Sequence, residues 1–255
     1  MVNLDQAIED FWRSASRGVY YPPDWFGKLS IDEAFRIQLG LLDKKLNRGE
    51  RLSGWKVGLT AKAIQEQFDV HEPLCGYLLH SGMISSGGQL TAAELINPGF
   101  ENEICMRLKA PLRGPGVDVK AARACVGELF PAIELVENRG DFSAQLAVSV
   151  ADNIQQCGFI LGEPIDLMPD FDLNSIRVRI RMNGKEIAVG TADSVLGNPL
   201  NSLVWLANKL DEYDRGLDAG QYVMSGSLTR QFPLILGDSV LAEFEGLGAV
   251  SLEMV

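Results

Sequence analysis

The chain has 255 residues, of which 46% are hydrophobic and 22% are charged. This composition is ordinary for a globular protein, and the length allows one large domain with a sizeable core. The formal net charge is −11. An acidic chain of this kind argues against nucleic acid and anionic membrane surfaces as partners, because both are bound by clustered lysine and arginine.

Cysteine and histidine are scarce. The four cysteines contain no Cys-x-x-Cys pair, so the sequence shows neither a zinc signature nor a disulfide framework. The only histidines are His71 and His80, which excludes a histidine-rich metal site. Catalysis would therefore depend on carboxylates, lysine, backbone donors or a hard metal ion. The acidic, amphipathic start is unlike a signal peptide, and no apolar run reaches membrane-spanning length, so we expect a cytoplasmic location.

The first part of the chain reads as mainly helical. Hydrophobic periodicity predicts helices over residues 3–17, 31–48 and 61–67, and a strand over residues 52–59. The second helix follows Ser30, and Glu33 completes a Ser-x-x-Glu capping box. We expect residues 1–72 to form a smaller N-terminal helical α/β lobe.

From about residue 73 the pattern changes to short apolar segments separated by glycine and proline. The clearest strand covers residues 176–182, and Asn183-Gly184 predicts a hairpin that returns through residues 185–189. Helices are predicted over residues 117–126 and 144–156 and from Asn198-Pro199, and two strands over residues 238–255. We therefore expect residues 73–255 to form the larger domain of an α+β protein, and to carry the catalytic residues if the protein is an enzyme.

Two glutamates lie two residues apart in the segment 98–108. If this segment is a strand, Glu101 and Glu103 point to the same face. Carboxylates so placed repel one another unless they are exposed, share a proton or bind a cation. Taken alone, the pair is more simply explained as an exposed strand face than as a metal site.

Glu134 gives the stronger reason to expect a cation. It lies in the nearly unbroken apolar run 129–136, where an unpaired buried carboxylate would cost several kcal/mol. Arg139 is the candidate structural partner, and a metal ion shared with Glu101 and Glu103 is the functional alternative.

Lys56 is a candidate acid/base or carboxylate anchor. It lies in a predicted strand between Trp55 and Val57, so partial burial would tune its pKa. An exposed strand lysine is the simpler alternative. The turn over residues 224–229 offers hydroxyls and backbone amides that could bind a carboxylate, although it also fits an ordinary polar turn.

The order of these motifs resembles the 2-keto-4-pentenoate hydratase and 4-oxalocrotonate decarboxylase family of the fumarylacetoacetate hydrolase superfamily. The resemblance extends from about residue 30 to the end of the chain. The matching stretches include WKVGLTAKAIQ (55–65), EPLCGYL (72–78), NPGFENEI (97–104), FPAIELVENR (130–139), SVADN (149–153), LGNPLNSLVWLANKL (196–210) and AGQYVMSGSLTR (219–230).

The resemblance implies a mixed β-roll with an N-terminal α/β lobe and a homo-oligomeric assembly. It assigns Glu101, Glu103 and Glu134 as ligands of Mg²⁺ or Mn²⁺, and Lys56 as the active-site lysine. It also implies a catalytic role for Asp152 in the SVADN motif, and substrate-binding roles for four further residues: Leu78, Asn153, Ser225 and Ser227.

One motif departs from the family pattern. Relatives usually carry an aspartate after the Pro-x-x-Gly segment, where this chain has His80 and Ser81. Since histidine titrates near neutrality, His80 is a candidate replacement for the acid/base, and a polar loop histidine is the alternative. Residues Gly99-Phe100 also differ from the charged or β-branched residues usual in relatives.

The resemblance implies a metal-dependent hydratase that adds water to a 2-hydroxy-2,4-dienoate, in the catabolism of aromatic compounds. The alternative is a 2-oxo acid decarboxylase of the 4-oxalocrotonate type, which would use the same metal site. An acylpyruvate hydrolase and a non-catalytic binding subunit are further alternatives.

Overall fold

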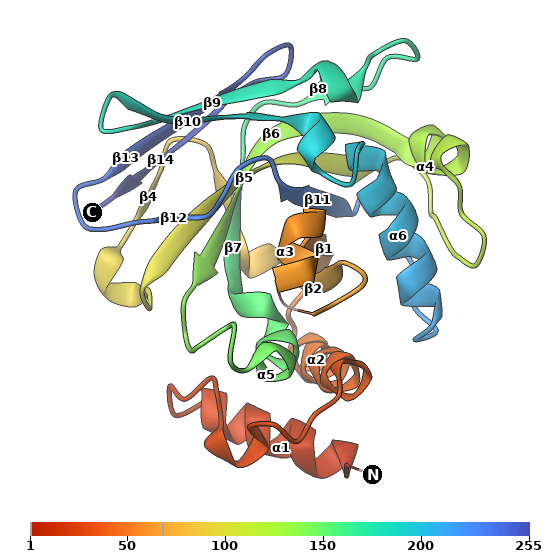
Figure 1. Cartoon of the computed structure of the whole chain (residues 1–255), viewed down its shortest axis with the longest axis vertical. Helices are drawn as coiled ribbons and strands as arrows, with labels where there is room; N and C mark the ends of the chain where they lie inside the picture. The colour runs from red at the N-terminus through yellow and green to blue at the C-terminus, as the bar shows by residue number, and fades with distance from the viewer. Residues whose placement is uncertain (1, 68) are drawn as a thin grey trace.

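The structure is a computed structural model that describes residues 2–67 and 69–255, without the side chains of residues 63 and 64. Within these residues, two sheets and six α-helices form a mixed architecture (Figure 1). This confirms the prediction of an α+β fold. None of the described helices combines the length and the apolar character needed to cross a membrane.

The larger sheet has nine strands. Its main path runs β2-β1-β11-β5-β6-β7-β3, with β12 paired to β5 and β8 paired to β6. The strands are β1 (Leu52–Gly58), β2 (Leu74–Leu79), β3 (Met83–Ser85), β5 (Pro98–Leu108), β6 (Val126–Glu137), β7 (Gln156–Leu161), β8 (Ile165–Asp166), β11 (Tyr222–Ser227) and β12 (Phe232–Pro233). Contact between β2 and β7 shows that the sheet curls, so it has an inner and an outer face.

The smaller sheet has five strands in the order β10-β9-β13-β14-β4. They are β4 (Gly88–Leu90), β9 (Arg177–Met182), β10 (Lys185–Thr191), β13 (Ser239–Phe244) and β14 (Gly248–Met254). The predicted hairpin is confirmed, because β9 and β10 pair across Asn183 and Gly184, both at positive φ. β13 and β14 contact β6 of the larger sheet, which joins the two sheets around one apolar core.

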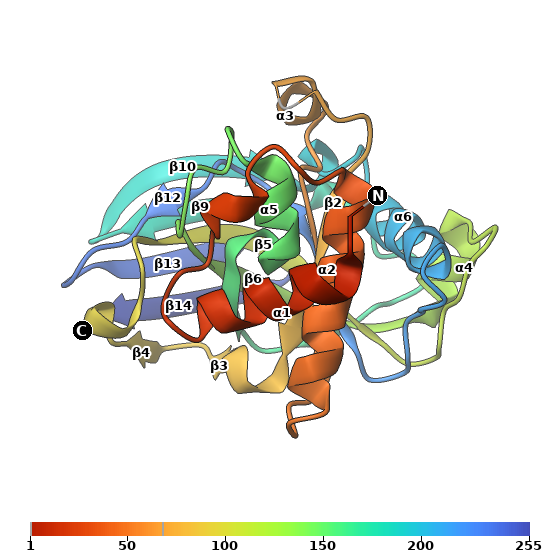
Figure 2. The same ribbon diagram turned by 90° about the horizontal axis from the view of Figure 1, so that it is seen from below.

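Six α-helices surround the sheets, as Figures 1 and 2 show. They are α1 (Leu4–Ala15), α2 (Ile31–Leu46), α3 (Lys62–Gln67), α4 (Val119–Cys125), α5 (Leu146–Ala151) and α6 (Pro199–Asp211). Short 3-10 segments are Pro23–Trp25, His80–Gly82, Ala92–Glu94, Asn153–Gln155, Leu173–Ser175 and Ala192–Ser194. The predicted helix starts are confirmed, because Ser30 and Glu33 form the capping box of α2 and Asn198 caps α6.

Two details qualify the sequence analysis. The helix predicted over residues 144–156 ends at Ala151, because the next residues turn into the left-handed region, with φ of 58° at Asn153 and 51° at Ile154. The boundary between residues 72 and 73 stays a prediction; β1, on its N-terminal side, lies between β2 and β11 in the larger sheet.

Candidate active site

The inner face of the curled sheet carries the predicted carboxylates. Glu101 in β5 lies opposite Glu134 in β6, and Glu103 lies opposite Ala132. Lys56 in β1 lies opposite Met224 in β11, which in turn lies opposite Cys105 in β5. Because directly paired residues of neighbouring strands point to the same face, the register brings all three glutamates and Lys56 together.

The three carboxylates form a compact cluster. One oxygen from each of Glu101, Glu103 and Glu134 lies within 4.8 Å of the others. Glu103 and Glu134 are fully buried, and Glu101 is half-buried. The Lys56 ammonium, itself only 3% exposed, lies 3.1 Å from Glu134 Oε1. Lys56 therefore takes the place beside Glu134 that the sequence analysis offered to Arg139.

A backbone donor orients one carboxylate. The Gly226 N–H donates to Glu103 Oε2 at 2.7 Å. Gly226 lies within β11, so residues 224–227, predicted as part of a turn, form the end of a strand that supplies an amide to the cluster. Gly226 has φ +110°, and a Cβ built there would lie 2.5 Å from the Thr60 side chain. Glycine is therefore the residue that allows this approach.

The cluster fits a divalent cation. Glu103 Oε1 and Glu134 Oε2 accept no hydrogen bond from the described residues, and unsatisfied buried acceptors are costly. Glu134 Oε1 has the Lys56 ammonium as its ion partner. Lys56 supplies one positive charge against three carboxylates, so the cluster lacks positive charge. An all-oxygen, carboxylate-rich donor set suits Mg²⁺, Mn²⁺ or Ca²⁺.

Electrostatics in the metal-free cluster favour protons on the carboxylates. Burial, together with the charge of Glu134, raises the pKa of Glu101 to about 7. The same two causes raise the pKa of Glu103 well above its usual value. Burial alone would lower the pKa of Lys56, but the charges of Glu134, Glu101 and Glu103 outweigh it and raise that pKa. Lys56 is therefore protonated near neutral pH.

These shifts give a testable pH dependence. Metal ligation requires deprotonated carboxylates, and Glu101 with a pKa of about 7 holds a proton below neutrality. We expect Mn²⁺ affinity to rise by at least about tenfold between pH 6 and pH 8, as one proton competing with the metal is lost. Calorimetric titration in two buffers of different ionisation enthalpy checks both the affinity and the proton release. An affinity that stays flat across this range would contradict the shifted pKa.

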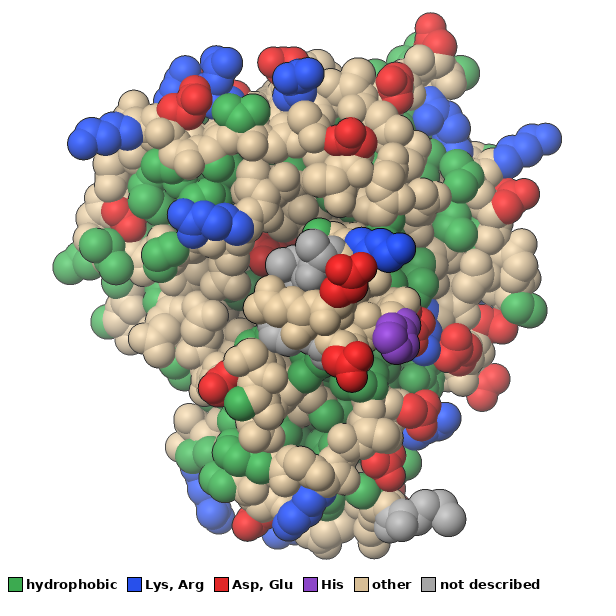
Figure 3. All heavy atoms as spheres, viewed as in Figure 1, with side chains coloured by type: hydrophobic (Ala, Val, Ile, Leu, Met, Phe, Trp, Pro, Cys, Tyr) green, Lys and Arg blue, Asp and Glu red, His purple; other side chains and the backbone are tan. Residues whose placement is uncertain are grey.

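A cavity of about 330 Å³ opens beside the cluster. Lys56 and Glu101 form its charged end, and residues 58–61 contribute to its lining. Its other lining residues are Val136, Asn138, Phe142, Ile154, Gln155, Ser227, Thr229, Arg230 and Gln231. In Figure 3 the surface is hollowed near the centre of the view, and acidic and basic side chains are interspersed around it.

The remaining predicted residues fall into two groups. Ser227 lines the cavity, whereas Ser225 is fully buried behind it, with its carbonyl oxygen bonded to Ser202. Leu78 belongs to an apolar cluster on the same inner face as the carboxylates. The members of this inner apolar cluster are Leu78, Cys105, Phe130, Ala132, Phe159 and Met224.

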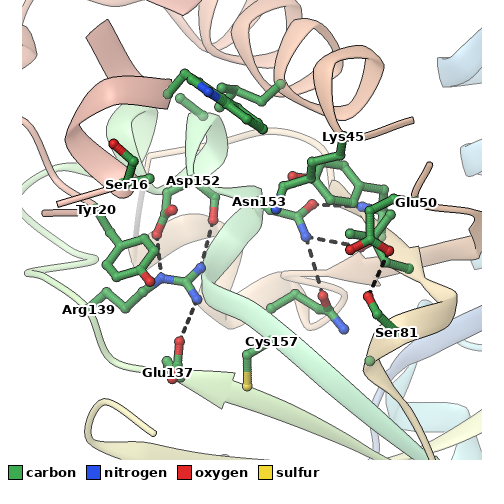
Figure 4. A pocket seen from close by; sticks show the side chains of 18 of the residues that line it. Ser16, Tyr20, Lys45, Glu50, Ser81, Glu137, Arg139, Asp152, Asn153 and Cys157 are labelled. Carbon is green, nitrogen blue, oxygen red and sulfur yellow. Dashed lines mark hydrogen bonds and ion pairs between the residues drawn. The ribbon is translucent and has the colours of Figure 1, made fainter. Parts of the chain in front are cut away.

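Asp152 and His80 lie away from the carboxylates. Asp152 accepts a hydrogen bond from Arg139 Nε at 2.7 Å and lines a second cavity of about 450 Å³, between α1, α2 and the end of β6 (Figure 4). His80 is exposed at the end of β2 and lines neither cavity. This geometry gives no support to direct catalytic roles for these two residues.

Several residues of the cavity were not predicted from the sequence. Gln155 follows the SVADN motif by two positions, and its place in the wall depends on the left-handed turn after α5. Arg230 ends the quoted AGQYVMSGSLTR stretch, so the motif contained it without indicating a role. Among the described residues, Arg230 has no carboxylate partner within ion-pair distance.

Comparisons with known proteins agree with this architecture. The sequence model described as fumarylacetoacetate (FAA) hydrolase C-terminal matches residues 45–255. A 4-oxalocrotonate decarboxylase of Pseudomonas putida is 33% identical, covering 90% of this chain and 88% of the relative. A 2-hydroxypent-2,4-dienoate hydratase of Pseudomonas putida is 38% identical, covering 72% and 84%.

A solved structure shows the same fold over the whole chain. The 4-oxalocrotonate decarboxylase from Pseudomonas putida G7, complexed with magnesium and adipate, superposes with a TM-score of 0.94 at 29% identity, covering 100% of this chain and 99% of that one. The protein thus belongs to the fumarylacetoacetate hydrolase family. Within it, the chain groups with the 2-keto-4-pentenoate hydratases and 4-oxalocrotonate decarboxylases, which confirms the predicted family and fold.

Proposed function

We propose that this protein is a divalent-metal hydratase that adds water to a 2-hydroxy-2,4-dienoate and forms a 4-hydroxy-2-oxo acid. The observation that carries the proposal is the buried cluster of three carboxylates with the ammonium of Lys56 at the end of one cavity. The relatives named as hydratases and decarboxylases act on acids of this class, which supports the same substrate chemistry here.

Glu101, Glu103 and Glu134 would hold Mg²⁺ or Mn²⁺. A cation bound there would supply Lewis-acid stabilisation of negative charge on the 2-oxo and carboxylate oxygens of the substrate. The chain supplies the remaining functions. The Gly226 amide fixes Glu103, and the protonated Nζ of Lys56 holds a proton at the edge of the cluster, where it can be transferred to or from the substrate.

The rest of the cavity suits a short unsaturated chain and a water molecule. Val136, Phe142 and Ile154 provide apolar contact for the hydrocarbon part. The Gln231 amide, with hydroxyls nearby, provides donors and acceptors for water. The Gln155 amide nitrogen donates instead to Tyr21 and to the Gly140 carbonyl oxygen. Hydration needs such a water, because its hydroxyl and a proton add to the two carbons of the distal double bond.

The decarboxylase alternative is favoured by one observation. Arg230 is a lining cation without a carboxylate partner among the described residues, so it could bind the second carboxylate of a substrate such as 2-oxohex-3-enedioate. A site for a mono-acid needs no such charge.

The test uses purified protein with Mg²⁺ and, separately, 2-hydroxypenta-2,4-dienoate and 2-oxohex-3-enedioate. Ultraviolet absorbance follows loss of the conjugated acid, and mass spectrometry identifies the product. We expect gain of water with the first acid, abolished by a chelator and restored by Mn²⁺. Loss of CO₂ from the second acid without hydration of the first would establish the decarboxylase instead. Absence of turnover with both acids would refute both.

A further inference from the structure

A strained turn separates the two cavities. Asn153, Ile154 and Gln155 have φ of 58°, 51° and 60°, and three successive non-glycine residues in the left-handed region are unusual. Asp152 and Asn153 line the second cavity, whereas Ile154 and Gln155 line the cavity beside the carboxylates. Strain of this kind persists only where the surrounding structure enforces it, so the contacts of the turn identify what it holds in place.

Arg139 fastens the turn to the strand that carries Glu134. Its Nε donates to Asp152 Oδ2 at 2.7 Å, and its Nη2 donates to the Asp152 carbonyl oxygen at 3.0 Å. Its Nη1 donates to Glu137, at the end of β6, at 2.9 Å. Figure 4 shows this guanidinium between the two carboxylates. The Arg139 side chain is nearly buried. Its two hydrogen bonds to Asp152, one to the side chain and one to the carbonyl oxygen, fix the position of the turn.

The Asn153 side chain pairs with the backbone at the outer edge of β2. Its Oδ1 accepts from the Tyr77 N–H at 2.7 Å, and its Nδ2 donates to the Tyr77 carbonyl at 3.0 Å. β2 is the terminal strand of the sheet path, so the amide satisfies a backbone donor and acceptor that have no neighbouring strand there. Asn153 is buried, which makes this two-point contact specific.

The same amide borders the side chain of Lys56. Gly76 precedes Tyr77 and lies opposite Lys56 in the register of β1 and β2. A Cβ built on Gly76 would lie 2.8 Å from Asn153 Oδ1 and 3.3 Å from Lys56 Cε. The Asn153 amide and the Lys56 stem therefore border the same space above the bare backbone of Gly76. An amide at this position narrows the space open to the stem, whose Nζ ends 3.1 Å from Glu134.

We propose that Asn153 is a positioning residue for Lys56, and that the Arg139–Asp152 pair holds Asn153 in that position. Asn153 is then no substrate ligand, and Asp152 acts on the site through the turn. This inference rests on the proposed function only in taking Lys56 as the residue that transfers the proton.

Asn153→Gly removes the side-chain amide and preserves the backbone turn, because glycine adopts the left-handed conformation without strain. We expect kcat to fall by about 10- to 100-fold, since small misplacement of a catalytic group is enough for such a loss. KM and Mn²⁺ affinity should change less than about threefold, because the substrate and the metal keep their own ligands. Asn208→Ala is the matched control: its amide makes the same two-point contact with Val117, at 3.0 Å for each bond, outside both cavities.

A second measurement reports on the environment of the Lys56 ammonium and does not require substrate turnover. The ¹H–¹⁵N signal of its buried ammonium, assigned by its loss in Lys56→Met, should shift or broaden in Asn153→Gly and stay unchanged in Asn208→Ala. If Asn153→Gly does not fold, Asn153→Asp tests the same contact, because it keeps the acceptor for the Tyr77 N–H and loses the donor to the Tyr77 carbonyl.

Three results would overturn the proposal. They are an unchanged Lys56 signal with wild-type kcat, a rise in KM with kcat unchanged, and an equal loss of kcat in Asn208→Ala. If the wild-type protein turns over neither acid, the proposed function fails, and the Lys56 signal still decides whether Asn153 positions the lysine.

Discussion

Glu134→Gln is expected to abolish Mn²⁺ binding and leave the fold intact. Glu134 is fully buried, its Oε1 is paired with the Lys56 ammonium, and its Oε2 accepts no hydrogen bond from the described residues. Glutamine keeps the size of the side chain and removes the charge that a cation needs. We expect affinity to fall at least about 100-fold, which corresponds to about 2.7 kcal/mol. The metal-free variant should still fold but unfold at a lower temperature than the wild type, because it loses the buried ion pair of Glu134 with Lys56.

Glu128→Gln is the matched control for this variant. Glu128 lies on the same strand, β6, and pairs with Arg107 near the surface, so the isosteric change there should leave Mn²⁺ affinity unchanged. Electron paramagnetic resonance of free Mn²⁺ measures both affinities, and circular dichroism confirms the fold. Wild-type affinity in Glu134→Gln would disprove the three-carboxylate site.

Lys56→Met is expected to remove turnover while the metal still binds. The ammonium lies beside Glu134, and the surrounding carboxylates raise its pKa, so it holds a proton at the reacting end of the cavity. Loss of a general acid or base typically lowers the rate by about 10²- to 10⁴-fold, and we expect kcat to fall within that range. Mn²⁺ affinity should be equal or higher, because a cation that competes for the same carboxylates has been removed.

Lys45→Met provides the control. Lys45 is also largely buried, burial lowers its pKa, and it lines the second cavity, so its loss tests whether removing any buried lysine affects catalysis. Steady-state kinetics with saturating Mg²⁺, together with thermal unfolding, separates the two variants. A kcat for Lys56→Met within tenfold of wild type would exclude proton transfer by this lysine.

Local sequence rules predicted much of the scaffold, because the signals act within a few residues. The capping box of α2 and the Asn183-Gly184 hairpin need only neighbouring residues, and both form as predicted. Strand alternation likewise placed Glu101 and Glu103 on one face. Glu101 and Glu103 lie close to Glu134 only because of the register between β5 and β6. Periodicity does not predict this register, and the proximity was predicted from the order of the family motifs.

The turn after α5 shows why the rest was not predictable. Residues 144–156 have the composition of one helix, and the left-handed residues that end it are enforced by contacts from distant segments: Tyr77 is 76 positions from Asn153. For the same reason Asp152, which follows the helix in sequence, lies beside Arg139 in the second cavity. Arg139 could not be assigned to Asp152 rather than to Glu134 without the tertiary fold.

The inner apolar cluster limits where a substrate can go once it has reached the carboxylates. Leu78, Phe130 and Phe159 are buried on the same inner face, and none of them lines the cavity beside the carboxylates. Under the proposed function, a substrate would enter this cavity with its oxo-acid head first, because Lys56 and Glu101 form its charged end, and its product would leave in the reverse order. A bound product would then exclude the next substrate until it has left.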